Sequence, residues 1–210
     1  MIKLLIADDH PLVMEGLKQI IKQTSDIIVV DEACNGGEVL DKLEMNNYDV
    51  ILLDFSMPQK NGIEILNEVK KKNVKTPILI LSIHPEEIYA IRCLKAGAYG
   101  YLTKDSAPNE LISAIRKVSM GEKYIRSSLA EKLVDALKVG FDEPFHGALS
   151  NREYQVMLLL ASGKSMQEIA EELFLSVKTV STYKTRILKK MKMRNTFEII
   201  SYAIKNKLIE

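Results

Sequence analysis

The chain has 210 residues with a formal net charge of +1, and 47% of its residues are hydrophobic, which is typical of about two globular domains. No apolar run approaches the ~18 residues that a membrane-spanning helix needs. The acidic pair Asp8 and Asp9 also interrupts the N-terminus before a secretory signal would form. Cys34 and Cys93 form no close pair or metal-like cluster, so we expect two buried free thiols. These features argue against membrane, secreted and disulfide-rich classes and predict a cytoplasmic protein with no membrane partner.

The net charge conceals an uneven distribution along the chain. Residues 1–144 carry 18 basic and 22 acidic side chains, whereas residues 145–210 carry 11 basic and 6 acidic ones. An acidic first part and a basic second part favour two partners of opposite charge. Chance variation in surface charge would give the same asymmetry, so charge alone leaves the question open.

Short apolar runs alternate with amphipathic stretches in the first part of the chain. Strands are predicted at residues 3–7, 27–33, 49–53, 77–81 and 98–102. Between them, apolar side chains recur at helical spacing, as they do from Leu12 to Ile21. Continuous apolar strands that alternate with helices predict a parallel sheet covered on both faces. The functional sites of such sheets lie outside the carboxyl ends of the strands.

The composition changes after the last helix of this part, which is predicted near Pro108–Ser119. Ser127–Leu137 has the pattern of a short linker helix, and Gly140–Gly147 has the composition of a hinge. The sequence from Leu149 onward is predicted to be all helical. We therefore expect an α/β domain and then an all-α domain, with boundaries at 1–120 for the first domain, 121–147 for a partly helical linker and 148–210 for the second domain.

Polar side chains follow four of the predicted strands. Asp8 and Asp9 end the first strand and Asp54 ends the third, so these carboxylates converge if the two strands are neighbours. Carboxylates that lie close together repel one another, and a hard cation such as Mg²⁺ relieves the repulsion. A carboxylate beside such a cation can attack phosphorus and form an aspartyl phosphate. Ser82 after the fourth strand and Lys104 after the fifth offer groups that bind a phosphoryl oxygen.

Each of these five residues also has an ordinary structural interpretation. Asp9 would serve equally well as the cap of a helix that begins at Pro11, and a Ser or Lys after a strand is common in loops. The joint placement at the ends of four strands is more specific than any one member. It favours a site for a divalent cation and a phosphoryl group.

Four segments resemble the receiver domains of bacterial response regulators over about residues 1–120. They are Ile6–His10, Leu52–Gly62 with the pattern D-x-x-M-P-x-x-x-G, Leu81–Ser82, and Ala96–Lys104 with the pattern G-A-x-G-Y-L-x-K. The resemblance implies a flavodoxin-like (βα)5 fold in which Asp54 is the phospho-acceptor.

The same resemblance implies roles for the residues around Asp54. Those that would hold Mg²⁺ are Asp8, Asp9, Asp54 and, through its backbone carbonyl, Ser56. Ser82 and Lys104 would bind the phosphoryl group, and Tyr101 would be the aromatic switch that follows Ser82 inward.

The last part of the chain has the pattern of a helix-turn-helix. Ser150 and Glu153 form a capping box at the start of a predicted helix. A second short helix is predicted at Ser165–Leu173, and after a brief turn Ser176 caps a third helix that runs to about Lys192. Two helices joined by a tight turn are an arrangement that many DNA-binding proteins use.

The predicted third helix has one apolar and one polar face. Its apolar stripe is Val180, Tyr183, Ile187 and Met191. The other face is hydroxylated and basic, and no carboxylate occurs between Ser176 and Arg194, which suits entry into a major groove. A basic, solvated surface helix would have the same composition. The candidate DNA contacts are Lys178, Thr179, Ser181, Thr182, Lys184, Thr185 and Lys189.

Residues 148–210 resemble the four-helix LuxR-type output domain. The segments that carry the resemblance are Leu149–Glu153, Ala161–Ser165, Glu168–Ala170, Leu175–Val180 and Ile187–Met191. A receiver domain followed by this domain is typical of the NarL/FixJ class. Two positions depart from the pattern, because Tyr183 stands where His is frequent and Ser181 stands where Lys is frequent. These departures leave open which DNA sequence is read there.

A fourth helix is predicted at Thr196–Leu208. Its apolar stripe, for which a core role is the simpler interpretation, is Phe197, Ile200, Ile204 and Leu208. Tyr202 and Ala203 face elsewhere. They are the dimerisation candidates, because this helix pairs two output domains in the resembled family.

The leading hypothesis is a transcription regulator that a sensor histidine kinase phosphorylates on Asp54. A homodimer of the phosphorylated protein would then bind an inverted-repeat site on double-stranded DNA. It would not be an enzyme, apart from catalysing its own phosphoryl transfer and dephosphorylation. The main alternative is a Mg²⁺-dependent phosphohydrolase, but the haloacid-dehalogenase type has a second Asp two residues after its nucleophile, where this chain has Ser56. A DNA-binding regulator that ignores phosphorylation is the other alternative.

Overall fold

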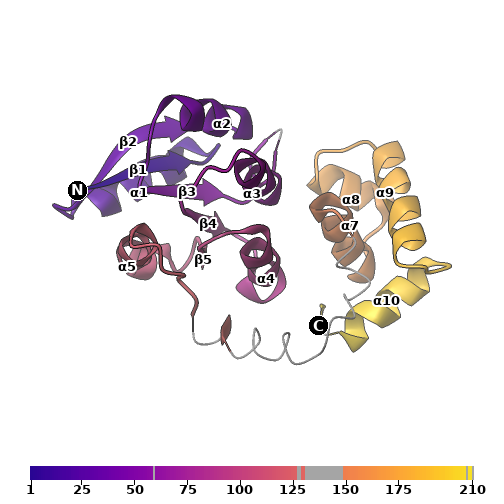
Figure 1. Ribbon diagram of the computed structural model, residues 1–210. Coiled ribbons are helices and arrows are strands. Elements are labelled where there is room, and N and C mark those ends of the chain that lie inside the picture. The colour runs from indigo at the N-terminus through magenta and orange to yellow at the C-terminus, as the bar shows by residue number, and fades with distance from the viewer. Residues whose placement is uncertain (59, 127–128, 131–148, 207, 210) are drawn as a thin grey trace. The chain divides into compact units, whose positions relative to one another are not determined.

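The structure is a computed structural model that describes all residues except 59, 127–128, 131–148, 207 and 210 (Figure 1). The chain divides into two compact units, residues 1–138 and residues 139–210. The linker helix predicted at Ser127–Leu137 and the hinge at Gly140–Gly147 lie outside the described residues, apart from Leu129 and Ala130. In the described part of the chain, no helix is long and apolar enough to cross a bilayer.

The N-terminal unit is built on a parallel five-stranded sheet in the order β2-β1-β3-β4-β5 (Figure 1). The strands are β1 (Ile2–Ala7), β2 (Ile27–Ala33), β3 (Val50–Asp54), β4 (Ile78–Ser82) and β5 (Gly100–Thr103). Every residue of β3 and β4 is buried, as expected for central strands with helices on both faces. The five predicted strands are confirmed, with shifts of one or two residues at their ends.

Four helices connect the strands, a fifth follows β5, and together they cover the sheet. They are α1 (Pro11–Lys22), α2 (Gly36–Met45), α3 (Gly62–Lys71), α4 (Glu86–Ala96) and α5 (Ala107–Ser119). An apolar core joins α1 and α5 to one face of the sheet, while α2, α3 and α4 contact one another in turn. Cys93 in α4 is buried, but Cys34 is exposed. The expectation of two buried thiols is therefore wrong for Cys34, which follows a strand at the edge of the sheet.

The strand order brings the carboxyl ends of β1, β3 and β4 together. Ala7 is the register partner of Leu53 across β1 and β3, and Asp54 is the partner of Leu81 across β3 and β4. Residues that follow these strands therefore meet at one edge of the sheet. His10 occupies the N-cap position of α1, and no side chain caps this helix, so the alternative role of Asp9 as a helix cap is wrong.

The N-terminal unit extends past the boundary predicted at residue 120. Tyr124 forms an isolated parallel β-bridge with Gly100 at the start of β5. Leu129 is buried as well. The chain that follows α5 therefore still belongs to this unit.

The C-terminal unit contains α7 (Asn151–Ala161), α8 (Met166–Glu172), α9 (Val177–Lys190) and α10 (Thr196–Lys205). A polar side chain caps the start of each helix, and the four caps are Ser150, Ser165, Ser176 and Asn195. The helices α8 and α9 contact each other across a short turn, and both contact α7. The predicted helix-turn-helix is therefore confirmed.

One buried carboxylate links the start of α7 to the end of α9. Glu153 accepts hydrogen bonds from the Ser150 backbone N (2.7 Å) and from Lys190 Nζ (2.6 Å). Burial would raise the pKa of Glu153, but the Lys190 ammonium and the Ser150 donors outweigh burial and hold it below its ordinary value. Val180 and Ile187 of α9 are buried as well. The ion pair holds the end of α9 against the start of α7.

The helix α10 turns a different face to the core from the one predicted. Ile199 and Ala203 are buried, whereas Phe197 is 80% exposed and Ile204 is 58% exposed. The predicted core stripe is wrong for Phe197 and Ile204, and so is the expectation that Ala203 faces away from the core. Apolar residues occur nearly all round this helix, so their spacing does not decide which side is buried.

Candidate functional site

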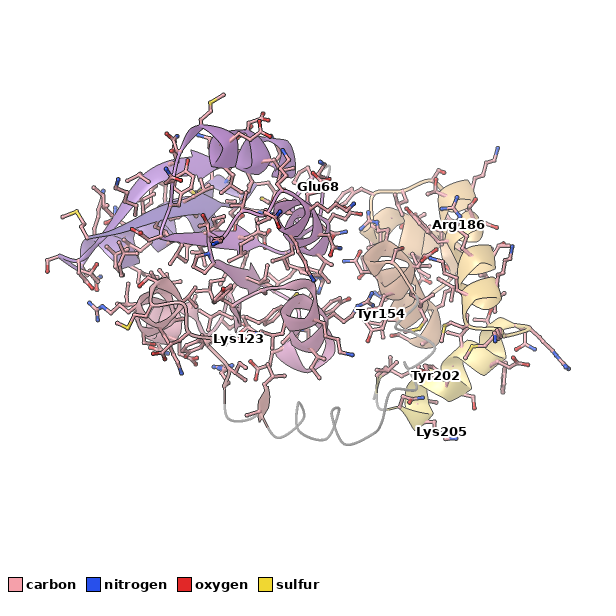
Figure 2. The ribbon with its side chains drawn as sticks, viewed as in Figure 1. Glu68, Lys123, Tyr154, Arg186, Tyr202 and Lys205 are labelled. Carbon is pink, nitrogen blue, oxygen red and sulfur yellow. The ribbon has the colours of Figure 1, made fainter. Side chains whose placement is uncertain are left out.

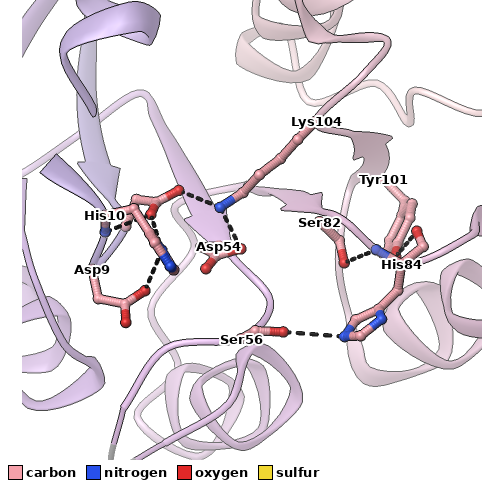
Figure 3. Close-up of polar contacts among 9 residues, drawn as sticks. Asp9, His10, Asp54, Ser56, Ser82, His84, Tyr101 and Lys104 are labelled. Atoms are coloured by element: carbon pink, nitrogen blue, oxygen red, sulfur yellow. Dashed lines mark hydrogen bonds and ion pairs between the residues drawn. The ribbon is translucent and has the colours of Figure 1, made fainter. Parts of the chain in front are cut away.

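Four side chains from the ends of β1 and β3 form an acidic cluster (Figure 3). One ligand atom from each of Asp8, Asp9, His10 and Asp54 lies within 4.8 Å of the others. Asp8 and Asp54 are buried, and Asp9 is partly exposed. Carboxylates and an imidazole in this arrangement are suitable ligands for a divalent cation. The convergence predicted for the three aspartates is therefore observed.

Lys104 enters the acidic cluster from the end of β5. Its Nζ lies 2.7 Å from Asp8 Oδ2 and 3.3 Å from Asp54 Oδ1 (Figure 3). Its backbone N donates to the Ser82 carbonyl (2.7 Å), which holds the loop after β5 against the end of β4. This one ammonium pairs with two of the three carboxylates in the cluster, so negative charge remains for a cation to balance.

Asp54 is 2% exposed, and its Oδ2 atom has no hydrogen-bond partner among the described residues. Burial raises the pKa of Asp54 to about 6, and the Asp8 charge adds to this effect, while Lys104 and the Ser56 backbone amide oppose it. A buried carboxylate oxygen without a protein donor is an expensive feature to maintain. It is also the feature that a metal-dependent nucleophile requires, and the donor set around it suits Mg²⁺.

Ser82 and Tyr101 lie beside the cluster in one connected arrangement (Figure 3). Ser82 is buried, and its Oγ accepts a hydrogen bond from the His84 backbone N (3.0 Å). Tyr101 is also buried and donates from its hydroxyl to the His84 carbonyl (2.9 Å); burial raises its pKa. The loop between β4 and α4 is therefore held at His84 by both predicted switch residues.

Two histidines near the site were not predicted from the sequence. The His10 Nδ1 atom lies 3.2 Å from Asp8 Oδ1 and 3.0 Å from Asp9 Oδ1. The His84 ring packs against Phe55 in a T-shaped arrangement and against Tyr89 at a tilt, and its Nε2 lies 3.3 Å from the Ser56 hydroxyl. The position of His10 directly after two acidic residues was the available sequence signal. The Ser56 carbonyl as a metal ligand remains a prediction.

The outer face of α9 is the second candidate site. Five of the predicted DNA contacts are exposed and two are half-buried; the exposed ones are Lys178, Ser181, Thr182, Thr185 and Lys189, and the half-buried ones are Thr179 and Lys184. The hydroxyls of Thr182 and Thr185 donate back to the carbonyls of Lys178 and Ser181, both at 3.0 Å. Their oxygens therefore remain able to accept hydrogen bonds from a ligand.

A hollow of about 310 Å³ lies on this face, lined by Ser176, Lys178, Thr179, Thr182, Tyr183 and Arg186. Arg186 is exposed on α9 (Figure 2) and was not among the predicted contacts. Its spacing from Thr179 and Tyr183 places it on their side of the helix. That spacing was the signal in the sequence that would have identified it.

Comparison with known proteins identifies the two domains that contain these candidate sites. The model of the response regulator receiver domain family matches residues 4–116, and that of the luxR family of bacterial regulatory proteins matches residues 147–203. The chain therefore belongs to the response regulators, and joins a receiver domain to a LuxR-type DNA-binding domain. This family consists of transcription regulators and not of classical enzymes.

Similar proteins of known class show which class of response regulator this chain belongs to. Response regulator UvrY of Escherichia coli K12 is 36% identical over 209 residues, which cover 99% of this chain and 96% of the relative. Oxygen regulatory protein NreC of Staphylococcus carnosus is 37% identical over 216 residues and 99% of both chains. UvrY and NreC are NarL/FixJ-class response regulators, so the predicted class is confirmed.

Solved structures show the same fold. RcsB from Salmonella enterica serovar Typhimurium, bound to promoter rprA with the phosphomimetic BeF3−, is 25% identical with a TM-score of 0.60 and coverage of 96% of this chain and 98% of RcsB. ChrA, from a heme-sensing two-component system, is 30% identical with a TM-score of 0.52 and coverage of 99% and 98%. The expected fold of both domains is thereby confirmed.

Proposed function

We propose that a sensor histidine kinase phosphorylates this response regulator on Asp54, and that phosphorylation controls its binding to DNA. The observation that carries the proposal is the Oδ2 atom of Asp54, which is buried and has no protein donor within the described chain. Its partner oxygen faces Lys104 Nζ at 3.3 Å. Oδ2 is therefore the atom of this carboxylate that is available to attack phosphorus.

The residues around Asp54 have different roles in the proposed phosphoryl transfer. Oδ2 attacks the phosphorus of a phosphohistidine, so that an O–P bond forms while the N–P bond breaks and the imidazole leaves. Lys104 stays beside the transferred group and balances part of its charge, and the Ser82 hydroxyl turns to donate to it. Mg²⁺, held by Asp8, Asp9, Asp54 and the Ser56 carbonyl, would neutralise the carboxylates and the incoming phosphoryl oxygens. The same residues would serve the later dephosphorylation.

We propose that α9 enters the major groove of an inverted-repeat site. Lys178 and Lys189 lie at the edges of the exposed face and reach backbone phosphates, while Thr182 and Thr185 approach base edges between them. Arg186 adds a further cationic contact that borders the hollow on this face. Because one short helix makes few phosphate contacts, two copies that bind together gain strongly in affinity.

The proposed homodimer on DNA is formed through α10. Ala203 is buried within its own unit and is no longer a candidate, whereas Tyr202 is half-buried. Phe197 and Ile204 lie on one exposed side of the helix, two turns apart. An exposed apolar stripe of this kind suits contact with a second copy of the helix. We propose that the regulator acts in the cytoplasm, where its kinase and DNA are accessible.

The test of the proposal is the substitution Asp54→Asn. A small phosphodonor with Mg²⁺ should label the wild-type protein, and should not label the variant, because an amide is neither nucleophile nor good metal ligand. Asp41→Asn, on the exposed side of α2, is the matched control and should be labelled normally. Label that persists on Asp54→Asn would place the acceptor elsewhere. Equal DNA affinity of labelled and unlabelled wild type would instead favour a regulator that ignores phosphorylation.

A further inference from the structure

The chain that follows α5 returns to the edge of the sheet and packs against β5. Gly121 turns the backbone with φ +79°, and the Tyr124 backbone N then donates to the Tyr99 carbonyl (2.7 Å) beside β5. A Cβ on Gly100 would lie 3.0 Å from the Tyr124 carbonyl oxygen and 2.8 Å from Leu79 Cδ1. The close approach of Tyr124 therefore requires glycine at position 100.

Side chains lock this segment onto two helices. The Tyr124 hydroxyl donates to Glu110 Oε2 on α5 (2.7 Å), and Arg126 Nε donates to the same oxygen (2.9 Å). A second guanidinium nitrogen of Arg126 contacts Glu110 Oε1, and Nη1 lies 3.4 Å from Glu86 Oε2. Arg126 thus bridges carboxylates on α5 and α4. We refer to Tyr124, Arg126, Glu86 and Glu110 as the clamp.

Glu86 connects the clamp to the loop that contains the switch residues. It is buried, it is the first residue of α4, and only Ile83, His84 and Pro85 separate it from Ser82. That loop is held by the His84 amide on Ser82 Oγ (3.0 Å) and by the Tyr101 hydroxyl on the His84 carbonyl (2.9 Å). A Ser82 hydroxyl that turns towards a phosphoryl group on Asp54 gives up its contact with the His84 amide. The start of α4 is then free to shift.

We propose that Arg126 reads the phosphorylation state of Asp54 through Glu86 and passes it to the chain that leads to the DNA-binding domain. In the unphosphorylated protein, Arg126 bridges Glu86 and Glu110 and holds the segment on β5. Phosphorylation moves the start of α4 and withdraws Glu86 from Arg126. The contact of Tyr124 with the edge of β5 then weakens. This inference rests on the proposed function, because it takes Asp54 as the phospho-acceptor.

Thermodynamic reciprocity makes the proposal measurable. If a phosphoryl group on Asp54 weakens the clamp, then a weakened clamp favours binding of a phosphoryl analogue by the same factor. Beryllium fluoride with Mg²⁺ is the probe, and the full chain is the sample. Arg126→Ala should bind it about fivefold more tightly than wild type or better. Arg126→Lys, which keeps the charge but cannot bridge two carboxylates, should shift the affinity in the same direction.

The matched control is Arg116→Ala. Arg116 lies on α5 and, like Arg126, makes hydrogen bonds to a carboxylate; its two bonds, both 2.8 Å, are to Asp26, which is outside the clamp. Its removal should leave the affinity for beryllium fluoride unchanged. Hydrogen exchange at the Tyr124 amide is the second readout, and beryllium fluoride should speed it about tenfold in the wild type and not at all in Asp54→Asn.

The outcomes separate this inference from the proposed function. Unchanged affinity in Arg126→Ala together with a Tyr124 amide that stays protected would overturn the role of the clamp while Asp54 remains the acceptor. Weaker binding in Arg126→Ala would also overturn it, because the clamp would then belong to the phosphorylated form. A wild-type protein that takes up no beryllium fluoride would overturn the proposed function, and this inference with it.

Discussion

Asp54 combines deep burial with the need to carry a negative charge. Its neighbours Asp8 and Lys104 act in opposite directions, and burial outweighs the lysine, so that the pKa of Asp54 rises to about 6. Without a cation, ionisation of this side chain at neutral pH therefore lowers the stability of the folded protein. A divalent cation or a phosphoryl group removes that cost, which links the stability of the domain to its ligands.

This cost predicts how stability depends on pH when metal is chelated. The ordinary pKa of 3.8 applies to the unfolded chain, and the pKa in the folded protein is about 6. The folded state therefore holds more protons between these values, so the contribution of Asp54 is fully present below the lower value and is lost as pH rises through the higher one. Asp54→Asn should be more stable than wild type by about 2–3 kcal/mol above about pH 7, and by less at about pH 5.

Urea denaturation in the presence of a chelator, at several pH values, measures this difference. Asp41→Asn replaces an exposed carboxylate and should follow the wild-type curve throughout. If the advantage of Asp54→Asn were the same at every pH, it would come from packing and not from the removal of a buried charge.

At the scale of the element, the residues of α9 have two different roles on DNA. Some contact backbone phosphates, and others contact base edges and so determine which sequence is bound. Lys178→Ala should weaken binding to all DNA sequences alike and make the salt dependence shallower by about one unit, because a phosphate contact carries no sequence information. Thr182→Ala should change which sequences are preferred, at a cost of about 1–3 kcal/mol on the native site. Selection from random duplexes tests the division. Identical preferences in the two variants would contradict it.

The helix α10 carries the prediction about dimerisation on DNA. Phe197→Ser should lower the affinity for a duplex with two half-sites about tenfold or more, because the second half-site then loses its linked partner. Affinity for a single half-site should not change. Phe174→Ser is the matched control, since Phe174 is 96% exposed in the turn before α9. A loss of equal size on the single half-site would show that Phe197 supports folding or DNA contact and not dimerisation.

At the scale of the whole molecule, the sequence predicts best those site residues that the order of the strands brings together. Asp54 and Ser82 end their strands and Asp8 directly follows one. Parallel strands end at one edge, so the convergence of these residues follows from the pattern. His84 reaches the site only because the loop after β4 folds back over Phe55. The periodicity of the sequence does not predict this contact between His84 and Phe55.

Two other features required tertiary information for a similar reason. Ile199 and Ala203 are on the buried side of α10, which packs against α7, and apolar residues on the opposite side obscure that choice in the sequence. The segment around Tyr124 looks like polar linker until β5 is known to be an edge strand with a glycine that admits it. A boundary drawn at residue 120 therefore divides a packed unit.

The seat of Tyr124 on β5 has a consequence for the solubility of the isolated receiver domain. A fragment that stops after Met120 leaves the start of β5 with unpaired backbone groups, and an open strand edge is a template for pairing with another chain. This fragment should self-associate as its concentration rises, whereas a fragment that ends after Ala130 should remain monomeric. Sedimentation of the two fragments compares them. Monomers in both cases would mean that Tyr124 gives no protection against strand pairing between molecules.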